Sequence, residues 1–202
     1  MNLANEIYRK SLHFLLILIP IFYVNLGKWK TLLIIAPLTA AVVFLDYYRR
    51  ENLKIQNLFV KTFGAILRPH EIERKKLCGA SNVGIAACIN FFLFEPKIAV
   101  TSFLILVISD GLAAIVGKSI PSRPFYEKSL AGALTFFITA LAILIGCGMY
   151  YHVQWWFYFF GIFSVACVTM VESRPSLIDL DDNFSIPMVF SLLMVGFGFM
   201  WG

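Results

Sequence analysis

The stretch IAVTSFLILVISDGLAAIVGK, residues 98–118, decides the fold class of this sequence. No charged residue interrupts it before Asp110, and the next one is Lys118. A helix needs about 20 predominantly apolar residues to cross a bilayer, and this stretch supplies them. The whole chain has the same character, since 59% of its residues are hydrophobic and only 14% are charged. The sequence therefore predicts an all-α, polytopic membrane protein and excludes a soluble domain, a coiled coil or a disulfide scaffold.

Working outward from this stretch, about seven apolar runs are candidate membrane spans. They are 11–27, 31–48, 79–95, 97–117, 130–150, 154–171 and 184–201. Between the second and third runs, residues 49–70 mix Leu, Ile and Phe with Arg and Lys, which predicts an amphipathic helix in the headgroup plane. We expect a single membrane-embedded catalytic domain over 1–202, and a homo-oligomer is compatible with it.

The basic residues are distributed unevenly between the two sides of these spans. Of the 17 Lys and Arg residues, only Lys28, Lys30 and Lys97 lie on the side opposite the N-terminus. Because basic loops stay in the cytoplasm, the sequence predicts a cytoplasmic N-terminus and an external C-terminus. The net charge of +5 is thus explained by orientation and by anionic lipid or phosphate, and no nucleic-acid partner is expected. The four cysteines lack the spacing and the His partners of a zinc site.

Asp110 is the first residue that calls for a functional explanation. It lies in the cytoplasmic half of the fourth predicted span, followed by the small residues Gly111, Ala114 and Gly117. A carboxylate at this depth costs a few kcal/mol, so such groups usually line a polar site. The alternative is an Asp engaged in a hydrogen bond or salt bridge between helices, and position alone favours the functional interpretation.

A basic segment precedes the fifth span. Lys128 and Ser129 are expected at a helix N-terminus, where free N–H groups and the helix dipole favour a phosphate. Lys128 would supply a point charge, and Ser129 a hydroxyl donor or a helix cap. By itself, Lys-Ser before a helix more often means only a capped helix.

An acidic segment lies between the sixth and seventh spans. It contains Glu172, Asp179, Asp181, Asp182 and Asn183, and oxygen ligands of this kind suit Mg²⁺ bound together with a substrate phosphate. For Asp179 and Asp181 we favour a solvated loop. For Glu172, Asp182 and Asn183, which adjoin the spans, we favour a site.

The remaining candidates are basic or lie near basic residues. Arg9, Lys10 and His13 lie on one side of the first helix, although orientation alone would explain Arg9 and Lys10. Arg68-Pro69-His70-Glu71 predicts a turn before the third span. His13 and this turn are harder to explain without chemistry, although a lone His is more often structural.

Taken in order, these motifs resemble a known family. They are Arg9-Lys10-x-x-His13, Arg68-Pro69-x-Glu71, Ser109-Asp110-Gly111, Lys128-Ser129-x-x-Gly132, and Glu172 followed by Asp182-Asn183. The set is similar to the CTP-dependent lipid kinases, which include dolichol kinase, phytol kinase and the yeast-type diacylglycerol kinase. Family members usually carry an acidic residue where this chain has Ala131, and Glu127 is a candidate replacement.

The resemblance implies that CTP phosphorylates a membrane lipid alcohol at the cytoplasmic face, with Mg²⁺ as cofactor. It implies Asp110, Asp182 and Glu172 as metal ligands, with Asp110, Lys128, Asp182 and Asn183 as catalytic residues. Phosphate or nucleotide contacts would come from Lys128, Ser129, Gly132, Arg68, Glu71, Arg9 and His13. The middle block is also similar to phosphatidate cytidylyltransferase, so formation of CDP-diacylglycerol is the alternative. An ion-coupled transporter with Asp110 as its coupling carboxylate is less favoured, because the polar residues cluster on one side.

Overall fold

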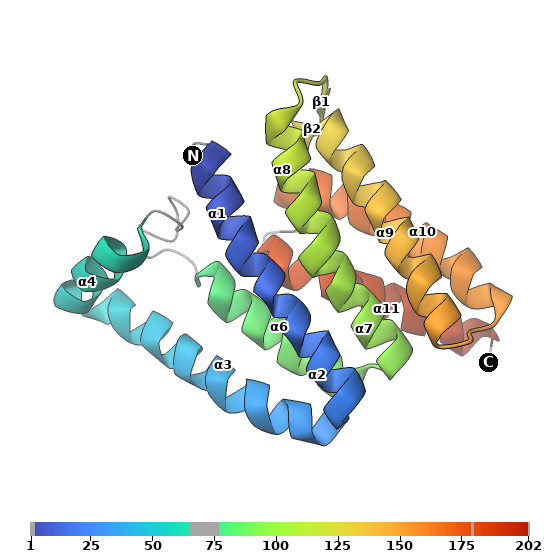
Figure 1. Cartoon of the computed structure of the whole chain (residues 1–202), viewed down its shortest axis with the longest axis horizontal. Coiled ribbons are helices and arrows are strands. Elements are labelled where there is room, and N and C mark those ends of the chain that lie inside the picture. The colour runs from blue at the N-terminus through green and yellow to red at the C-terminus, as the bar shows by residue number, and fades with distance from the viewer. Residues whose placement is uncertain (1–2, 65–76, 179, 202) are drawn as a thin grey trace.

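The computed structural model describes residues 3–64, 77–178 and 180–201, and these residues are almost entirely helical (Figure 1). The N-terminal half contains α1 (Leu3–Phe14), the 3₁₀ turn η1 (Leu15–Ile17), α2 (Leu18–Leu26), α3 (Lys28–Glu51), α4 (Leu53–Phe63) and α6 (Gly79–Leu93). The C-terminal half contains α7 (Pro96–Leu104), the π-helical segment η2 (Ile105–Asp110), α8 (Gly111–Ser119), strands β1 (Pro124–Phe125) and β2 (Lys128–Ser129), α9 (Leu130–Tyr150), α10 (Trp155–Ser173), η3 (Pro175–Leu177) and α11 (Asp182–Trp201).

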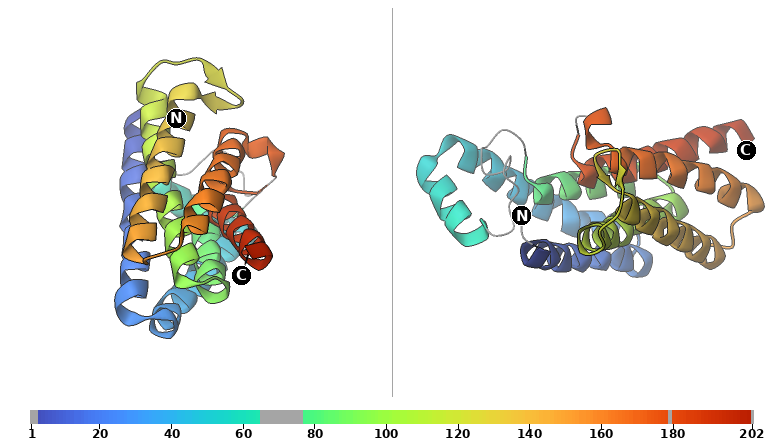
Figure 2. Two further views of the ribbon diagram at one scale, coloured as in Figure 1. Left: turned by 90° about the vertical axis from the view of Figure 1, so that its right-hand side faces the viewer. Right: turned by 90° about the horizontal axis from the view of Figure 1, so that it is seen from above.

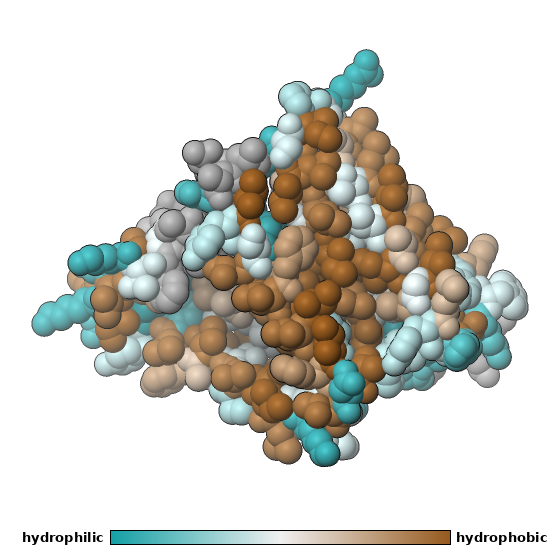
Figure 3. Space-filling view, viewed as in Figure 1, coloured by the Kyte–Doolittle hydropathy of each residue, from teal (hydrophilic) through white to brown (hydrophobic). Residues whose placement is uncertain are grey.

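The membrane fold class predicted from the sequence is confirmed. Five helical segments are long and apolar enough to cross a membrane: Asn5–Leu26, Lys28–Glu51, Pro96–Ser119, Leu130–Tyr150 and Trp155–Ser173. Two further apolar helices, at Gly79–Leu93 and Asp182–Gly198, match the other predicted spans but are shorter. Apolar side chains dominate the face of the molecule seen in Figure 3, as expected for a surface in contact with lipid.

The predicted amphipathic helix begins later than expected. Residues 49–51 belong to α3, so a start at residue 49 is wrong. Asn52 leaves the helical conformation, and its side-chain oxygen accepts hydrogen bonds from the N–H groups of Lys54 and Ile55, which starts α4. The helix extends to Phe63 and is followed by Gly64, and residues 65–70 of the predicted segment lie outside the described residues.

The continuous helix α7–η2–α8 forms the centre of the bundle. It contacts α9, α11, α6 and α1, and the core around it includes the fully buried rings of Phe91, Phe103 and Phe136. Helix α1 packs against α8 at Gly111, where an added Cβ would lie 2.7 Å from the ring of Phe14. Only glycine permits this approach, and it brings the charged N-terminal turns of α1 beside Asp110.

The antiparallel hairpin of β1 and β2 joins α8 to α9 and was not anticipated from the sequence. Figure 2 shows that it projects from the same end of the bundle as the N-terminus of α1. This end therefore combines the hairpin, the start of α1 and the start of α9.

Candidate functional site

A polar cavity of about 690 Å³ lies at this end of the bundle. It collects side chains from α1, the α8 span, the hairpin, α9, α10 and α11. The candidate residues that line it are Arg9, Asp110, Lys128, Ser129, Gly132, Glu172 and Asp182. Further charged groups in its lining are Glu6, Lys10, Lys118 and Glu127. Residues separated by up to 176 positions in the chain thus share one cavity.

Lys128 lies between two carboxylates at the centre of this lining. Its ammonium group donates to Glu172 at 2.5 Å and to Asp182 at 3.2 Å. Burial lowers the pKa of Lys128, but the negative charges of Asp182, Glu172 and Asp110 outweigh it and raise the pKa well above its usual value. Lys128 is therefore a permanent cation at physiological pH.

Asp110 is paired with a lysine of the first helix. Its carboxylate accepts a hydrogen bond from the buried Lys10, and His13 Nε2 lies 3.8 Å from the same oxygen. Asp110 ends the π-helical segment η2, a local widening that occurs frequently at functional sites. The inter-helix salt bridge considered for Asp110 is thus present, and the same side chain also lines the polar cavity.

A second ion-pair group lies beside Asp110. Glu6 accepts hydrogen bonds from Arg9 on its own helix and from Lys118 on α8. Orientation in the membrane was sufficient to explain Arg9 and Lys10 from the sequence, whereas the structure gives both side chains specific acidic partners. Cations and carboxylates are thus paired at the contact between α1 and the α8 span.

Ser129 is the N-cap of α9. Its hydroxyl accepts from the Gly132 N–H at 3.2 Å and donates to the Gly117 carbonyl at 3.1 Å. The N–H of Leu130 donates to the Arg123 carbonyl, and that of residue 131 to a Ser122 hydroxyl. The expectation of free N–H groups at this helix start is therefore wrong. Of the two kinds of phosphate contact expected from this segment, the Lys128 ammonium group remains, because Lys128 lines the polar cavity.

Gly132 has a packing role at the same crossing. A Cβ added to it would lie 3.1 Å from the Ala113 carbonyl oxygen and 3.4 Å from the Cα of Gly117. The absent side chain lets α9 lie directly against α8. This contact holds Lys128 and Ser129 at the edge of the polar cavity.

The polar cavity brings together carboxylates, the side chains that could hold a metal ion. Among the described residues, no three His, Cys, Asp or Glu side chains are arranged to hold a metal ion. Glu172 and Asp182 nevertheless direct oxygens to one point, the Nζ atom of Lys128. Hard carboxylate oxygens of this kind suit Mg²⁺ that arrives with a nucleotide.

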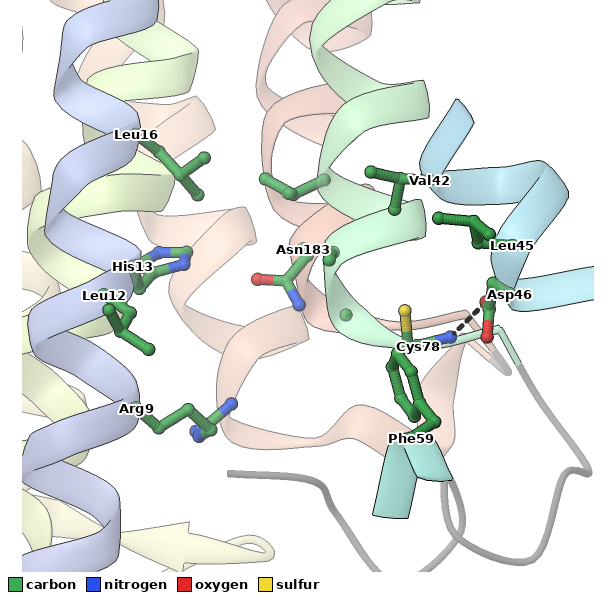
Figure 4. A pocket seen from close by; sticks show the side chains of 13 residues that line it. Arg9, Leu12, His13, Leu16, Val42, Leu45, Asp46, Phe59, Cys78 and Asn183 are labelled. Carbon is green, nitrogen blue, oxygen red and sulfur yellow. Dashed lines mark hydrogen bonds between the residues drawn. The ribbon is translucent and has the colours of Figure 1, made fainter. Parts of the chain in front are cut away.

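Asn183 and His13 belong mainly to a second cavity of about 460 Å³ (Figure 4). Its apolar lining includes Leu12, Leu16, Val42, Leu45, Phe59 and Val83. Asn183 follows Asp182 directly, but its side-chain and backbone N–H groups donate to Asp181 at 2.7 and 3.0 Å. Neighbouring residues at the start of α11 therefore line different cavities.

Comparison with known proteins places the chain in a family. Over 189 residues it is 33% identical to the uncharacterized protein RP860 of Rickettsia prowazekii (strain Madrid E), an alignment that covers 91% of this chain and 90% of the relative. The chain belongs to the RP860 family. No family model matches the chain, and no solved structure matches it.

The RP860-family chain is also similar to phytol kinases. It is 34% identical over 110 residues to phytol kinase 1, chloroplastic, of Arabidopsis thaliana, covering 48% of this chain and 36% of the relative. It is 31% identical over 141 residues to the probable phytol kinase 2, chloroplastic, of Oryza sativa subsp. japonica, covering 64% and 45%. The matches thus cover less than half the length of these phytol kinases. They support a lipid kinase-like family.

Two candidates lie outside the described residues. Arg68 and Glu71 fall in the segment 65–76, so their predicted phosphate contacts stay predictions. Glu127, the candidate replacement for an acid at Ala131, lies in the hairpin turn before α9 and not in the helix itself. It nevertheless lines the polar cavity, where it accepts a hydrogen bond from Ser176.

Sequence reasoning did not single out a buried hydrogen-bond network beside this second cavity, which we call the apolar cavity. Asp46 accepts from Arg49 at 2.6 Å, from the Cys78 N–H at 2.8 Å and from the Ser81 hydroxyl at 2.9 Å. Arg49 also donates to Gln56 of α4 at 2.9 Å. The spacing of an Asp and an Arg three residues apart in an apolar helix was the available signal.

Proposed function

We propose that this protein phosphorylates the hydroxyl of a membrane lipid alcohol, with CTP as the phosphoryl donor and Mg²⁺ as cofactor. The observation that carries the proposal is the polar cavity at one end of a membrane bundle, with Lys128 placed between Glu172 and Asp182. The similarity to phytol kinases supports the same reaction class. Such a cavity gives a charged nucleotide access to a substrate that stays in the bilayer.

Phosphoryl transfer requires positioning and charge stabilisation more than covalent help from the protein. In the proposed reaction, the alcohol oxygen forms a bond to the γ-phosphorus and the bond from that phosphorus to the bridging oxygen breaks. CDP leaves with the electron pair, and one proton is released to water. Bound Mg²⁺ would supply neutralisation of the phosphate charge.

In this proposal, the cationic and the acidic residues of the polar cavity have different roles. Lys128 and Arg9 are the cations that would contact the triphosphate, because both line the polar cavity. Asp110, Glu172 and Asp182 are the carboxylates that would hold Mg²⁺. Before substrate binds, Lys128 neutralises the charges of Glu172 and Asp182. When Mg²⁺ binds to these carboxylates, the ammonium group of Lys128 would contact the phosphates.

The proposed site faces the cytoplasm, where CTP is available. The excess of basic residues on the side of the N-terminus supports this orientation, with the C-terminus outside. The lipid alcohol would approach from within the bilayer and the nucleotide from the aqueous side.

The test uses purified full-length protein in detergent micelles with CTP labelled at either the α- or the γ-phosphorus. A panel of phytol, polyprenol, diacylglycerol and phosphatidate serves as acceptors. We expect γ-label to enter an alcohol and α-label to remain in CDP. Transfer of α-label to phosphatidate with release of pyrophosphate would instead establish cytidylyl transfer. Absence of label from every lipid, with a folded protein, would refute both activities.

A further inference from the structure

The second cavity differs from the polar cavity in its lining and in its access. It lies between α1, α3 and α6, and most of its surface is apolar. Three apolar residues of its lining, on two candidate membrane spans, are themselves exposed: Leu12 at 41%, Val42 at 37% and Leu45 at 57%. In a membrane protein, exposed apolar side chains of this kind contact acyl chains. The cavity can therefore be entered sideways from the bilayer.

One end of this apolar cavity is polar. Figure 4 shows the side chains of His13 and Asn183 facing each other across it, with Arg9 on the side of the α1 N-terminus. His13 Nε2 lies 3.3 Å from the Leu106 carbonyl oxygen and 3.8 Å from Asp110. The polar end is thus directed toward the cavity that contains Lys128.

Arg9 connects the two cavities. It lines both of them, and its buried Nε atom has no hydrogen-bond partner within the described part of the chain. Its Nη2 atom donates to Glu6, so the guanidinium is held in place while this bond uses only one of its five N–H groups. A group at the junction of the two cavities could accept a hydrogen bond from another of these N–H groups.

We propose that the apolar cavity binds one long-chain aliphatic or isoprenoid alcohol, with its hydroxyl at His13 and Asn183 and its chain along Leu12, Leu16 and Val42. This assignment rests on the proposed function and extends it to the site of the acceptor. The hydroxyl then lies at the junction where Arg9 meets both cavities, next to a phosphoryl group held in the polar cavity.

The chemistry of the lining argues for a single-chain alcohol over a phospholipid. A volume of about 460 Å³ falls within the range of pockets that enclose one small ligand. Asp46 contributes no free charge, because both its carboxylate oxygens are hydrogen-bonded within the protein. Arg9 is the one cation in the described lining, and it is already paired with Glu6. The cavity thus offers hydrogen bonds to a hydroxyl but little charge to a phosphodiester.

The first experiment needs no catalysis. Full-length protein in lipid nanodiscs is irradiated with an aliphatic alcohol that carries a mid-chain diazirine, and the labelled peptides are mapped. We expect label at residues 12–16 and 42–45, and we expect excess phytol to remove it. Label spread evenly over lipid-facing helices, or displaced only by a diacyl phospholipid, would overturn the proposal.

Neighbouring leucines of η1 provide a matched pair of variants. Leu16 lines the cavity, whereas Leu15 is 60% exposed on the lipid-facing surface and is absent from the described lining. We expect Leu16→Trp to reduce labelling at residues 42–45 and to raise the KM for the alcohol, each by about tenfold. Leu15→Trp should change neither value. Binding of a fluorescent CTP analogue should be the same in both variants, since neither residue lines the polar cavity.

The two proposals fail in different ways. If wild-type protein transfers no phosphate but shows phytol-sensitive label at residues 42–45, the kinase assignment fails and the alcohol site stands. If phosphate is transferred and Leu16→Trp has the KM and the labelling of Leu15→Trp, the alcohol site is wrong. Should Leu16→Trp not fold, the labelling of the wild-type protein decides alone.

Discussion

Replacing Lys128 with Met gives the most direct test of the polar cavity. The change keeps an unbranched side chain of similar length and removes the charge between Glu172 and Asp182. Two carboxylates then lose the same partner, and Glu172 is almost completely buried. Both stability and activity should fall, by amounts that follow from the geometry.

The distances set the scale of the loss. At an effective dielectric constant of about 20, the 2.5 Å and 3.2 Å contacts correspond to attractions of about 7 and about 5 kcal/mol. Most of this attraction offsets the cost of removing the three charges from water. Breaking such a pair by removing one partner still leaves buried charge uncompensated. We expect Lys128→Met to lower the free energy of unfolding by about 3 kcal/mol.

Stability is measured by denaturant unfolding in detergent micelles, with Glu172→Gln and the double variant completing a cycle. A coupling energy of about 1–3 kcal/mol is expected for residues in direct contact. The pKa of Lys128 is raised above its usual value of 10.5, so this stabilisation is complete below pH 10.5 and lost only above it. The difference between wild type and Lys128→Met should therefore stay constant from pH 7 to pH 10.

The kcat of the Lys128→Met variant is a second measurement that tests the polar cavity. Removal of one positioned electrostatic group from a transfer site typically lowers kcat by about 10²–10³-fold. Lys128→Arg keeps the charge, so it should retain most of the stability but lose activity, because a planar guanidinium replaces a compact ammonium. Additive effects in the double-variant cycle would refute the pairing. Wild-type turnover in a folded Lys128→Met protein would remove Lys128 from the mechanism.

Four other changes test separate parts of the structure. Asp110→Asn should leave the protein folded but nearly inactive, measured as γ-label transfer to alcohol; normal turnover would make its salt bridge purely structural. Glu127→Gln should raise the Mg²⁺ concentration for half-maximal activity several-fold, and an unchanged Mg²⁺ titration would exclude it as a replacement for the acid missing at Ala131. Asp46→Ala should cost about 3–5 kcal/mol in chemical unfolding, since it removes the carboxylate that forms an ion pair with the fully buried Arg49; a loss below 1 kcal/mol would contradict this. A reporter that is active only in the cytoplasm should be silent when fused to the C-terminus, and activity there would reverse the predicted orientation.

The sequence was sufficient to predict the helical membrane fold, because span length and apolar content are local properties. It also supported grouping Asp110, Lys128, Glu172 and Asp182, since all four were expected on the same side of the membrane. Periodicity placed the end of α3 and the start of α4 imprecisely. The boundary depends on the cap made by Asn52, which a basic and apolar pattern does not reveal.

The partners of the charged residues were not predictable from local pattern. Lys10 pairs with Asp110 across 100 positions, and Lys118 pairs with Glu6 across 112. Both pairs depend on how α1 packs against α8, which is a property of the tertiary arrangement. The apolar cavity has the same origin, since α1, α3 and α6 each supply ordinary apolar residues. A cavity between helices leaves no periodic signal in any one of them.

The hairpin before α9 bears on Ala131, the position where the lipid kinases that this sequence resembles are expected to carry an acid. The N–H of residue 131 bonds to Ser122, so this position closes the turn and its side chain is absent from the described lining of the polar cavity. Glu127 is held in place by the end of α10 and by η3. Its N–H donates to the Ser173 carbonyl, and its carboxylate accepts a hydrogen bond from Ser176. These bonds join the hairpin to the end of α10, immediately after Glu172. An acid on the hairpin can thus reach the polar cavity from a position that helix spacing alone would not have suggested.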